Sequence, residues 1–130
     1  MTKHSDTSKG SRGFLRRHRF ALLATCLLAV IIAWATLTPT PPTPDLDSPH
    51  VDKIYHVVAF AVLVLSTAVL YARSLTWVLP LACVFGIAIE LVQPYTGRAA
   101  EVADILADLV GIGVGTAVGL TLRAIVRRRA

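Results

Sequence analysis

Residues 54–72 read IYHVVAFAVLVLSTAVLYA, and this stretch decides the fold. Its 19 residues include no Asp, Glu, Lys or Arg, and a run of about 18 such residues is long enough to cross a bilayer as a helix. A helix satisfies every backbone hydrogen bond within the segment, as a lipid environment requires. The run does not alternate apolar with polar residues, which disfavours a β-barrel. We therefore expect a transmembrane helix here.

Three further segments have the same character, at 20–37, 75–92 and 105–123. The first contains no charged residue, the second contains only Glu90, and the third contains Asp108 before its basic end. We expect an all-α, multi-pass membrane bundle of four transmembrane helices. The expected division of the chain is a basic cytoplasmic tail (1–19), the first helix (20–37), a Pro-rich outer loop (38–51), helices two to four (52–126) and a basic C-terminal tail (127–130).

Composition agrees with a membrane protein and argues against a soluble one. Of the 130 residues, 55% are hydrophobic and 16% are charged, too few charges to keep the large surface of so small a domain in water. The net charge of +5 could suggest a nucleic-acid partner. The basic residues, however, gather at the two ends of the chain, and Phe14 is the only aromatic residue among them. We expect no nucleic-acid binding.

The distribution of charge also predicts the topology. If both termini are cytoplasmic, 11 basic residues lie inside and only Lys53 and Arg98 lie outside, as the positive-inside rule favours. The acids show the reverse, because Asp6 alone lies inside and the other seven lie outside or in the outer half of the membrane. An alternative for 20–37 is a secretory signal, since basic residues precede it and Ala33-Trp34-Ala35 resembles a cleavage site.

Polar side chains recur at the outer ends of the last three predicted helices. Each helix carries a pair at a spacing of three or four residues, which places both members on one face. Ionisable residues at this depth cost about 2.5 to 3.5 kcal/mol each, so they suggest function. The predicted polar cluster comprises Asp52, Lys53, His56, Glu90, Gln93, Arg98, Asp104 and Asp108. With Glu101 it holds five carboxyl groups and two cations, which predicts protonated carboxyls or a bound cation.

Three interpretations of this cluster stay open. It can be a network that fixes the register of the helices, or a metal or proton site in which His56 acts with carboxylates, although no H-E-x-x-H motif is present. It can also bind a charged headgroup, with Arg98 and Lys53 on a phosphate. His56 could act as a general base on a phosphoester. The cluster holds no Ser or Cys nucleophile, so the sequence assigns no catalytic residue, metal or cofactor.

Small residues follow one face of the fourth predicted helix. Gly111, Gly115 and Gly119 recur every four residues after Ala103 and Ala107. Such a face lets another helix backbone approach closely. The partner is helix two or three of the same chain, or a second copy, in which case the protein is a homo-oligomer.

Taken together, the polar residues resemble the motif of the VanZ-like family of small bacterial membrane proteins. The resemblance covers roughly the last 80 residues. Its family pattern is D-K-x-x-H, then E-x-x-Q, an Arg and D-x-x-x-N-x-x-G. The matching residues are Asp52, Lys53, His56 and Phe60, then Glu90, Leu91 and Gln93, then Gly97 and Arg98, then Asp104, Asp108 and Gly111. The chain departs from the family at Asp108, where Asn is usual.

The resemblance implies a protein of the bacterial cell envelope, located in the cytoplasmic membrane. The namesake of the family confers low-level teicoplanin resistance, so a link to glycopeptide resistance is an expectation for this chain. Our leading hypothesis is that the polar cluster binds a membrane-lipid headgroup or a lipid-linked cell-wall precursor. The alternatives are an enzyme acting on a lipid-linked phosphate substrate and a small ion-coupled transporter subunit.

Overall fold

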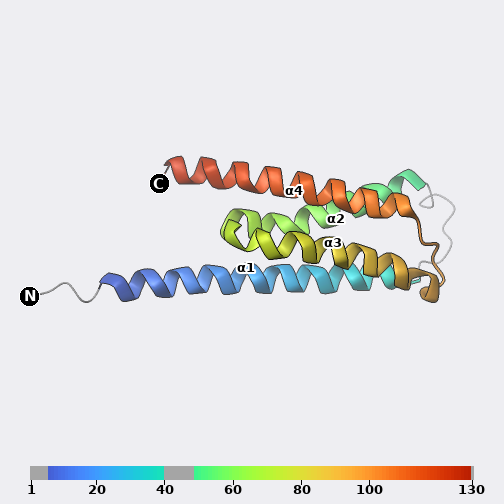
Figure 1. The fold of residues 1–130 in the computed structure, drawn as a ribbon, viewed down its shortest axis with the longest axis horizontal. Helices are drawn as coiled ribbons and strands as arrows, with labels where there is room; N and C mark the ends of the chain where they lie inside the picture. The colour runs from blue at the N-terminus through green and yellow to red at the C-terminus, as the bar shows by residue number, and fades with distance from the viewer. Residues whose placement is uncertain (1–5, 40–48, 130) are drawn as a thin grey trace, which may run out of the picture.

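The computed structural model describes residues 6–39 and 49–129. It consists mainly of four long helices (Figure 1). The helices are α1 (Asp6–Leu37), α2 (Pro49–Leu70), α3 (Leu75–Val92) and α4 (Val102–Arg129), with short 3-10 helices η1 (Ala72–Ser74) and η2 (Gln93–Thr96) flanking α3. Each long helix contains a segment that is long and apolar enough to span a membrane. The predicted all-α bundle with four such helices is confirmed.

The helix ends differ from the predicted ones mainly outside the apolar segments. Helix α3 coincides with the predicted 75–92, whereas α1 begins at Asp6 and includes most of the predicted tail 1–19. Helix α4 likewise runs through Arg129 into the predicted tail 127–130. Helices extend past an apolar run because each added residue gains a hydrogen bond and Arg is a good helix former. Residues 40–48 of the predicted Pro-rich loop lie outside the described residues.

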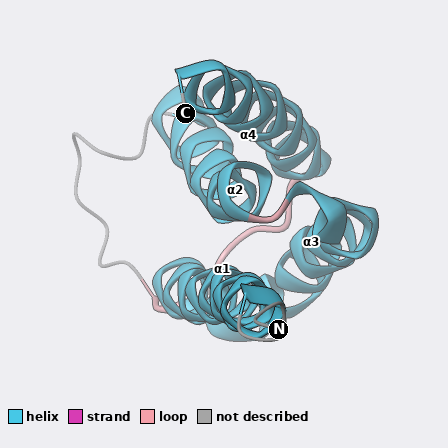
Figure 2. Cartoon of the chain, turned by 90° about the vertical axis from the view of Figure 1, so that its left-hand side faces the viewer, coloured by secondary structure: helices cyan, strands magenta, loops and turns pink. Residues whose placement is uncertain are grey.

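Helix α2 is the centre of the bundle, because its contacts with the other three helices are the most extensive. Its most extensive contact is with α4, and Figure 2 shows these two helices side by side. The start of α1 and the end of α4 lie at one end of the bundle, on the left in Figure 1. The connection from α3 to α4 lies at the opposite end, which we call the loop end.

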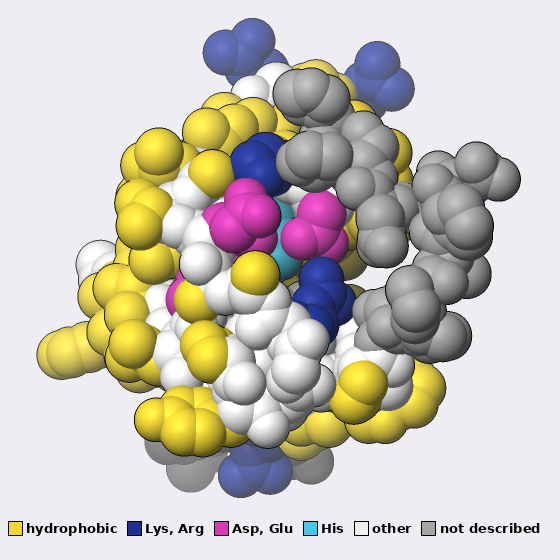
Figure 3. Space-filling model, turned by 90° about the vertical axis from the view of Figure 1, so that its right-hand side faces the viewer, with side chains coloured by type: hydrophobic (Ala, Val, Ile, Leu, Met, Phe, Trp, Pro, Cys, Tyr) yellow, Lys and Arg dark blue, Asp and Glu magenta, His cyan; other side chains and the backbone are white. Residues whose placement is uncertain are grey.

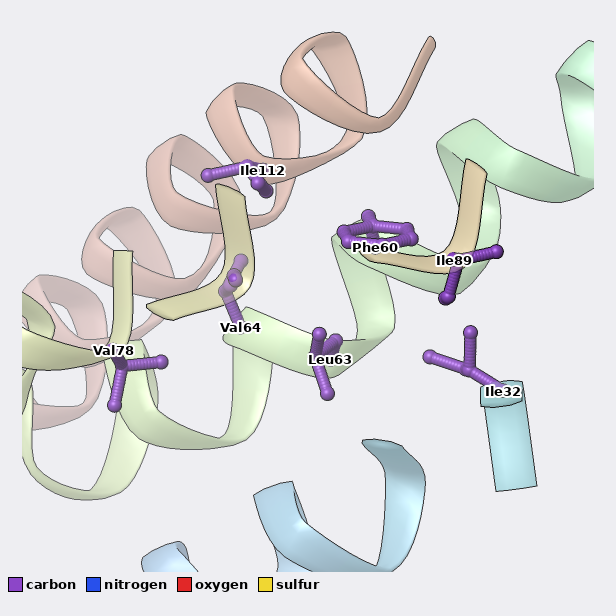
Figure 4. Close-up of a cluster of buried hydrophobic side chains, with 8 residues drawn as sticks. Ile32, Phe60, Leu63, Val64, Val78, Ile89 and Ile112 are labelled. Atoms are coloured by element: carbon purple, nitrogen blue, oxygen red, sulfur yellow. The ribbon is translucent and has the colours of Figure 1, made fainter. Parts of the chain in front are cut away.

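A small apolar core holds the helices together and draws on all four of them (Figure 4). Its residues include Ile32, Phe60, Leu63, Val64, Val78, Ala82, Ile89 and Ile112. Large apolar side chains also cover the outside, and Trp34 and Trp77 are 73% and 75% exposed. An apolar exterior of this extent would be unfavourable in water, and it suits a bundle surrounded by lipid.

The glycine face of α4 lies against α2 of the same chain. Gly111, Gly115 and Gly119 are buried, and a Cβ atom on Gly115 would lie 2.7 Å from the Cα of Ala61. Because the neighbouring atoms are backbone, there is no room for a side chain there. Of the partners that the sequence left open for the glycine face, the structure shows the second helix, α2. A homo-oligomer through α4 stays a prediction, and it would have to use another face of this helix.

Candidate functional site

The polar cluster forms at the loop end of the bundle. The first two turns of α2 carry Asp52, Lys53 and His56. Glu90 lies in the last turn of α3, and Gln93 lies in η2. Arg98 lies in the connection to α4, whose first two turns supply Asp104 and Asp108. Figure 3 shows acidic and basic side chains gathered around a histidine on this face, with apolar side chains around them. All eight predicted residues therefore lie at one end of the bundle.

A buried pair joins α2 to α4 at the bottom of the cluster. His56 Nδ1 lies 2.8 Å from Asp108 Oδ1, and both side chains are about 2–3% exposed. When Asp108 is ionised, Nδ1 is the donor of this hydrogen bond, because a carboxylate only accepts. The pair can form because Gly111, one turn beyond Asp108, lets α4 approach α2. The other oxygen of Asp108 faces Gly86 of α3, where a Cβ would lie 2.5 Å away.

Two ion pairs at the rim hold the connection between α3 and α4 against α2. Lys53 Nζ lies 2.8 Å from Glu101 Oε2 and 3.6 Å from Asp104 Oδ1. Arg98 Nη2 donates to Asp52 Oδ1 at 3.0 Å. The chain turns at Gly97, whose φ of 83° is a left-handed conformation that favours glycine. These pairs position the connection, and screening by solvent keeps the contribution of the exposed ones to stability small.

Glu90 and Gln93 form hydrogen bonds with the backbone of neighbouring segments and so hold these segments in place. Glu90 is buried, and its Oε2 accepts a hydrogen bond from the backbone N–H of Glu101 at 2.8 Å. Gln93 is also buried, and its amide donates to the backbone carbonyl of Thr36 in α1 at 3.4 Å. For these two residues the structure supports the interpretation as a network that fixes the helices.

The network is incomplete, because several buried polar atoms of the cluster have no hydrogen-bond partner among the described residues. These atoms are His56 Nε2, Glu90 Oε1, Gln93 Oε1, Asp104 Oδ1 and Asp108 Oδ2. A buried polar atom without a partner costs about 1–3 kcal/mol. Bound water, an ion or a polar ligand could each supply the missing partners.

Three residues of the cluster could hold a metal ion. A ring nitrogen of His56 and one carboxylate oxygen each from Asp52 and Asp104 lie within 4.8 Å of one another. Asp52 is half-buried, and the other two side chains are buried. This set combines an imidazole with two carboxylates, which are ordinary ligands of divalent cations.

A cavity of about 430 Å³ opens beside the cluster, between α1 and α2. Most of its wall is apolar, including Ile31 and Ile32 from α1 and Phe60 from α2. Asp52, His56 and Arg98 form its polar end. The cavity therefore joins the polar cluster to an apolar surface, and it has the volume of a small-molecule site.

Sequence patterns missed three residues that matter for this site. Glu101 was counted among the charges of the predicted cluster but not among its site residues. In the structure its side chain pairs with Lys53, and its backbone N–H donates to Glu90 Oε2. Gly86 lies one turn before Glu90, and this spacing could have signalled that it faces the cluster. Nothing in the sequence singles out Thr36, because Gln93 contacts its backbone.

Comparison with known proteins adds no further assignment. No protein-family model matches the chain, and neither curated proteins nor solved structures give a significant match. The VanZ-like resemblance therefore rests on the residues quoted above and stays a prediction. The function has to be argued from the geometry of the site.

Proposed function

We propose that this chain is a VanZ-like protein of the bacterial cytoplasmic membrane whose polar cluster binds the phosphate headgroup of a lipid. In this proposal both termini are cytoplasmic and the cluster faces outward, where lipid-linked wall precursors are used. The topology is supported by the charge distribution and by the four apolar helices. The link to teicoplanin resistance is part of the proposal and rests on the resemblance.

The observation that carries the proposal is the cavity between α1 and α2, with apolar walls and a polar end. A lipid needs both features, because its chain has to leave water and its headgroup has to meet polar partners. Ile31, Ile32 and Phe60 offer the apolar contact, and Arg98 offers the cation. A guanidinium group can bind a phosphate through two parallel hydrogen bonds.

Two basic side chains at the rim of the cluster offer partners for a phosphate, on an end of the bundle that also holds five carboxyl groups. Lys53 and Arg98 are the only two basic residues of the predicted outer side, and both are at the rim of the cluster. Arg98 pairs with the half-buried Asp52, and Lys53 pairs with the exposed Glu101 as well as with the buried Asp104. Each cation thus has one carboxylate partner at the exposed rim that a phosphate could replace at small cost. The two cations are therefore available to steer and hold such a headgroup.

Native mass spectrometry of the detergent-purified chain tests the headgroup. Polyprenyl phosphate is expected to form a one-to-one adduct, and the uncharged polyprenol is expected to bind at least tenfold less. Arg98→Gln should remove this difference. Arg123→Gln is the matched control, because Arg123 lies at the other end of the bundle and donates to the Val69 carbonyl at 2.9 Å. Equal binding of both lipids by the unaltered chain would refute headgroup recognition.

A second pair of variants tests the lipid chain. Ala35 is an exposed residue that lines the cavity beside the cluster, so Ala35→Phe should block adduct formation. Ala88 is an exposed residue that lines a separate apolar cavity of about 470 Å³ between α1 and α3. Ala88→Phe should leave the adduct unchanged. Loss of binding in both variants, or in neither, would contradict the assignment of the first cavity.

The topology and the biological role have their own tests. In a chain without its native cysteines, a cysteine at position 45 should react with an impermeant reagent in intact cells. A cysteine at position 130 should react only after lysis. Expression of the chain should raise the teicoplanin concentration that stops growth, and Arg98→Gln should abolish this effect at an unchanged membrane level.

A further inference from the structure

We propose that Asp52, His56 and Asp104 form a binding site for one divalent cation, and that Zn²⁺ is the ion that fits this donor set. The site is distinct from the headgroup proposal, because it needs no lipid to exist. It accounts for three features of the cluster that neither the helix network nor the headgroup explains. These are the His56 nitrogen and the Asp104 oxygen that have no hydrogen bond among the described residues, and the excess of acidic groups.

The distances suit a metal site with small side-chain movements. One donor atom from each of the three residues lies within 4.8 Å of the other two. Zinc binds nitrogen and oxygen at about 2.0 to 2.2 Å, so neighbouring ligands of a tetrahedral ion lie about 3.4 Å apart. Rotation of the carboxylates can close the remaining gap, since the Asp52 side chain is 39% exposed and has room to move.

His56 is oriented as metal-binding histidines are. Its Nδ1 lies 2.8 Å from Asp108 Oδ1. In the neutral imidazole that donates from Nδ1 to Asp108, Nε2 is the nitrogen with a free lone pair. Nε2 is buried and has no hydrogen-bond partner among the described residues. Metal-bound histidines usually donate their other ring N–H to a carboxylate or carbonyl, which fixes the tautomer and the ring. Asp108 is thus a positioning residue in this site.

A bound cation compensates the excess negative charge of the cluster better than protonation of a carboxyl group does. Five carboxyl groups face two basic side chains at this end of the bundle. Asp104 Oδ1 has no hydrogen bond among the described residues and lies 3.6 Å from Lys53 Nζ. Protonation of a carboxyl would lower the charge but would leave His56 Nε2 unpartnered. A divalent cation offsets two negative charges and engages both buried atoms. Lys53 keeps Glu101 as a partner when Asp104 turns to the metal.

The donor types favour zinc over a hard ion. Imidazole is a typical zinc ligand, whereas Mg²⁺ and Ca²⁺ prefer sites made of oxygen alone. Three protein ligands are also the number found where zinc keeps one position open. Asp52 and His56 line the cavity between α1 and α2, so the open position is available to an oxygen ligand that enters from this cavity.

Metal content of the full chain tests the site without any lipid. The chain is purified in detergent, treated with a chelator and dialysed against buffered Zn²⁺, and zinc per chain is measured by mass spectrometry. One equivalent is expected for the unaltered chain. Asp52→Asn and Asp104→Asn should each weaken binding by more than about tenfold. Asp6→Asn is the matched control, because it makes the same change from acid to amide at the start of α1, at the opposite end of the bundle.

Cobalt separates direct coordination from loose attraction. Bound Co²⁺ should give visible absorption bands in the unaltered chain, and His56→Gln should remove them. Asp108→Asn should keep the bands and weaken binding by about 10- to 100-fold, as expected for a positioning residue. Gel filtration checks that each variant is folded. The proposal is wrong if the folded chain binds no zinc, if both Asp variants bind as tightly as the unaltered chain, or if Mg²⁺ binds more tightly.

Discussion

Alanine at Gly115 is expected to separate α2 from α4 and to destabilise the whole bundle. The added Cβ would lie 2.7 Å from the Cα of Ala61, whereas ordinary van der Waals contact begins at 3.4 Å. The helices must therefore move apart by at least 0.7 Å at this point. Because the obstructing atoms belong to the α2 backbone, no side-chain rotation relieves the clash.

The size of the effect follows from two opposing terms. Overpacking of a close helix contact costs about 1 to 3 kcal/mol. Alanine is a better helix former than glycine by about 1 kcal/mol, which offsets part of this cost. Gly113→Ala is the matched control, because Gly113 lies on the same helix with nothing within 4 Å of its Cβ position. It gains the propensity term without the clash and should be neutral or slightly stabilising.

Thermal stability of the purified chains measures the difference. Each variant is heated in detergent, and the fraction that still elutes as a monodisperse peak is followed against temperature. Gly115→Ala should lose this peak at a clearly lower temperature than Gly113→Ala. Equal midpoints for the two variants would refute the close approach of α4 to α2. A lower midpoint for Gly113→Ala would mean that the opposite face of α4 is the packed one.

Three further predictions test single contacts. Gly86→Ala would place a Cβ 2.5 Å from Asp108 Oδ2, so zinc affinity should fall about tenfold in the dialysis assay while the protein stays folded. Thr67→Val keeps the volume of the side chain but removes the 2.9 Å hydrogen bond to Thr25 Oγ1, and it should lower the free energy of unfolding by about 0.6 kcal/mol. Gly97→Ala forces alanine into a left-handed conformation and should cost about 1 to 2 kcal/mol in the same heating assay.

The helices could be predicted from the sequence because lipid leaves the backbone few choices. An uncharged run such as 54–72 has to form a helix, and α2 covers most of it. The ends of the helices were less predictable. Water satisfies backbone groups outside the membrane, so residues such as those before 20 can extend a helix or not, and α1 begins at Asp6. An apolar run fixes where a span lies, and capping and propensity fix where the helix ends.

The sequence predicted which residues gather in the polar cluster better than it predicted which of them contact one another. Four-residue spacing places Asp104 and Asp108 on one face of α4, whatever the neighbouring helix is. It does not give the rotation of that face toward α2 or α3, so the pair of His56 with Asp108 and the proximity of Asp52 to Asp104 appear only in the structure. These contacts depend on how closely α4 approaches α2, which Gly111 permits.

Asp108 connects the close helix packing to the chemistry proposed for the cluster. Where the VanZ-like pattern usually has Asn, this chain has a carboxylate that accepts a hydrogen bond from His56 at 2.8 Å. An amide oxygen could accept the same bond, but a carboxylate makes the imidazole a better electron donor at Nε2. It also adds a negative charge to a cluster that already has too many. A carboxylate at position 108 therefore has a cost without a cation and a benefit with one, in agreement with the metal proposed at His56.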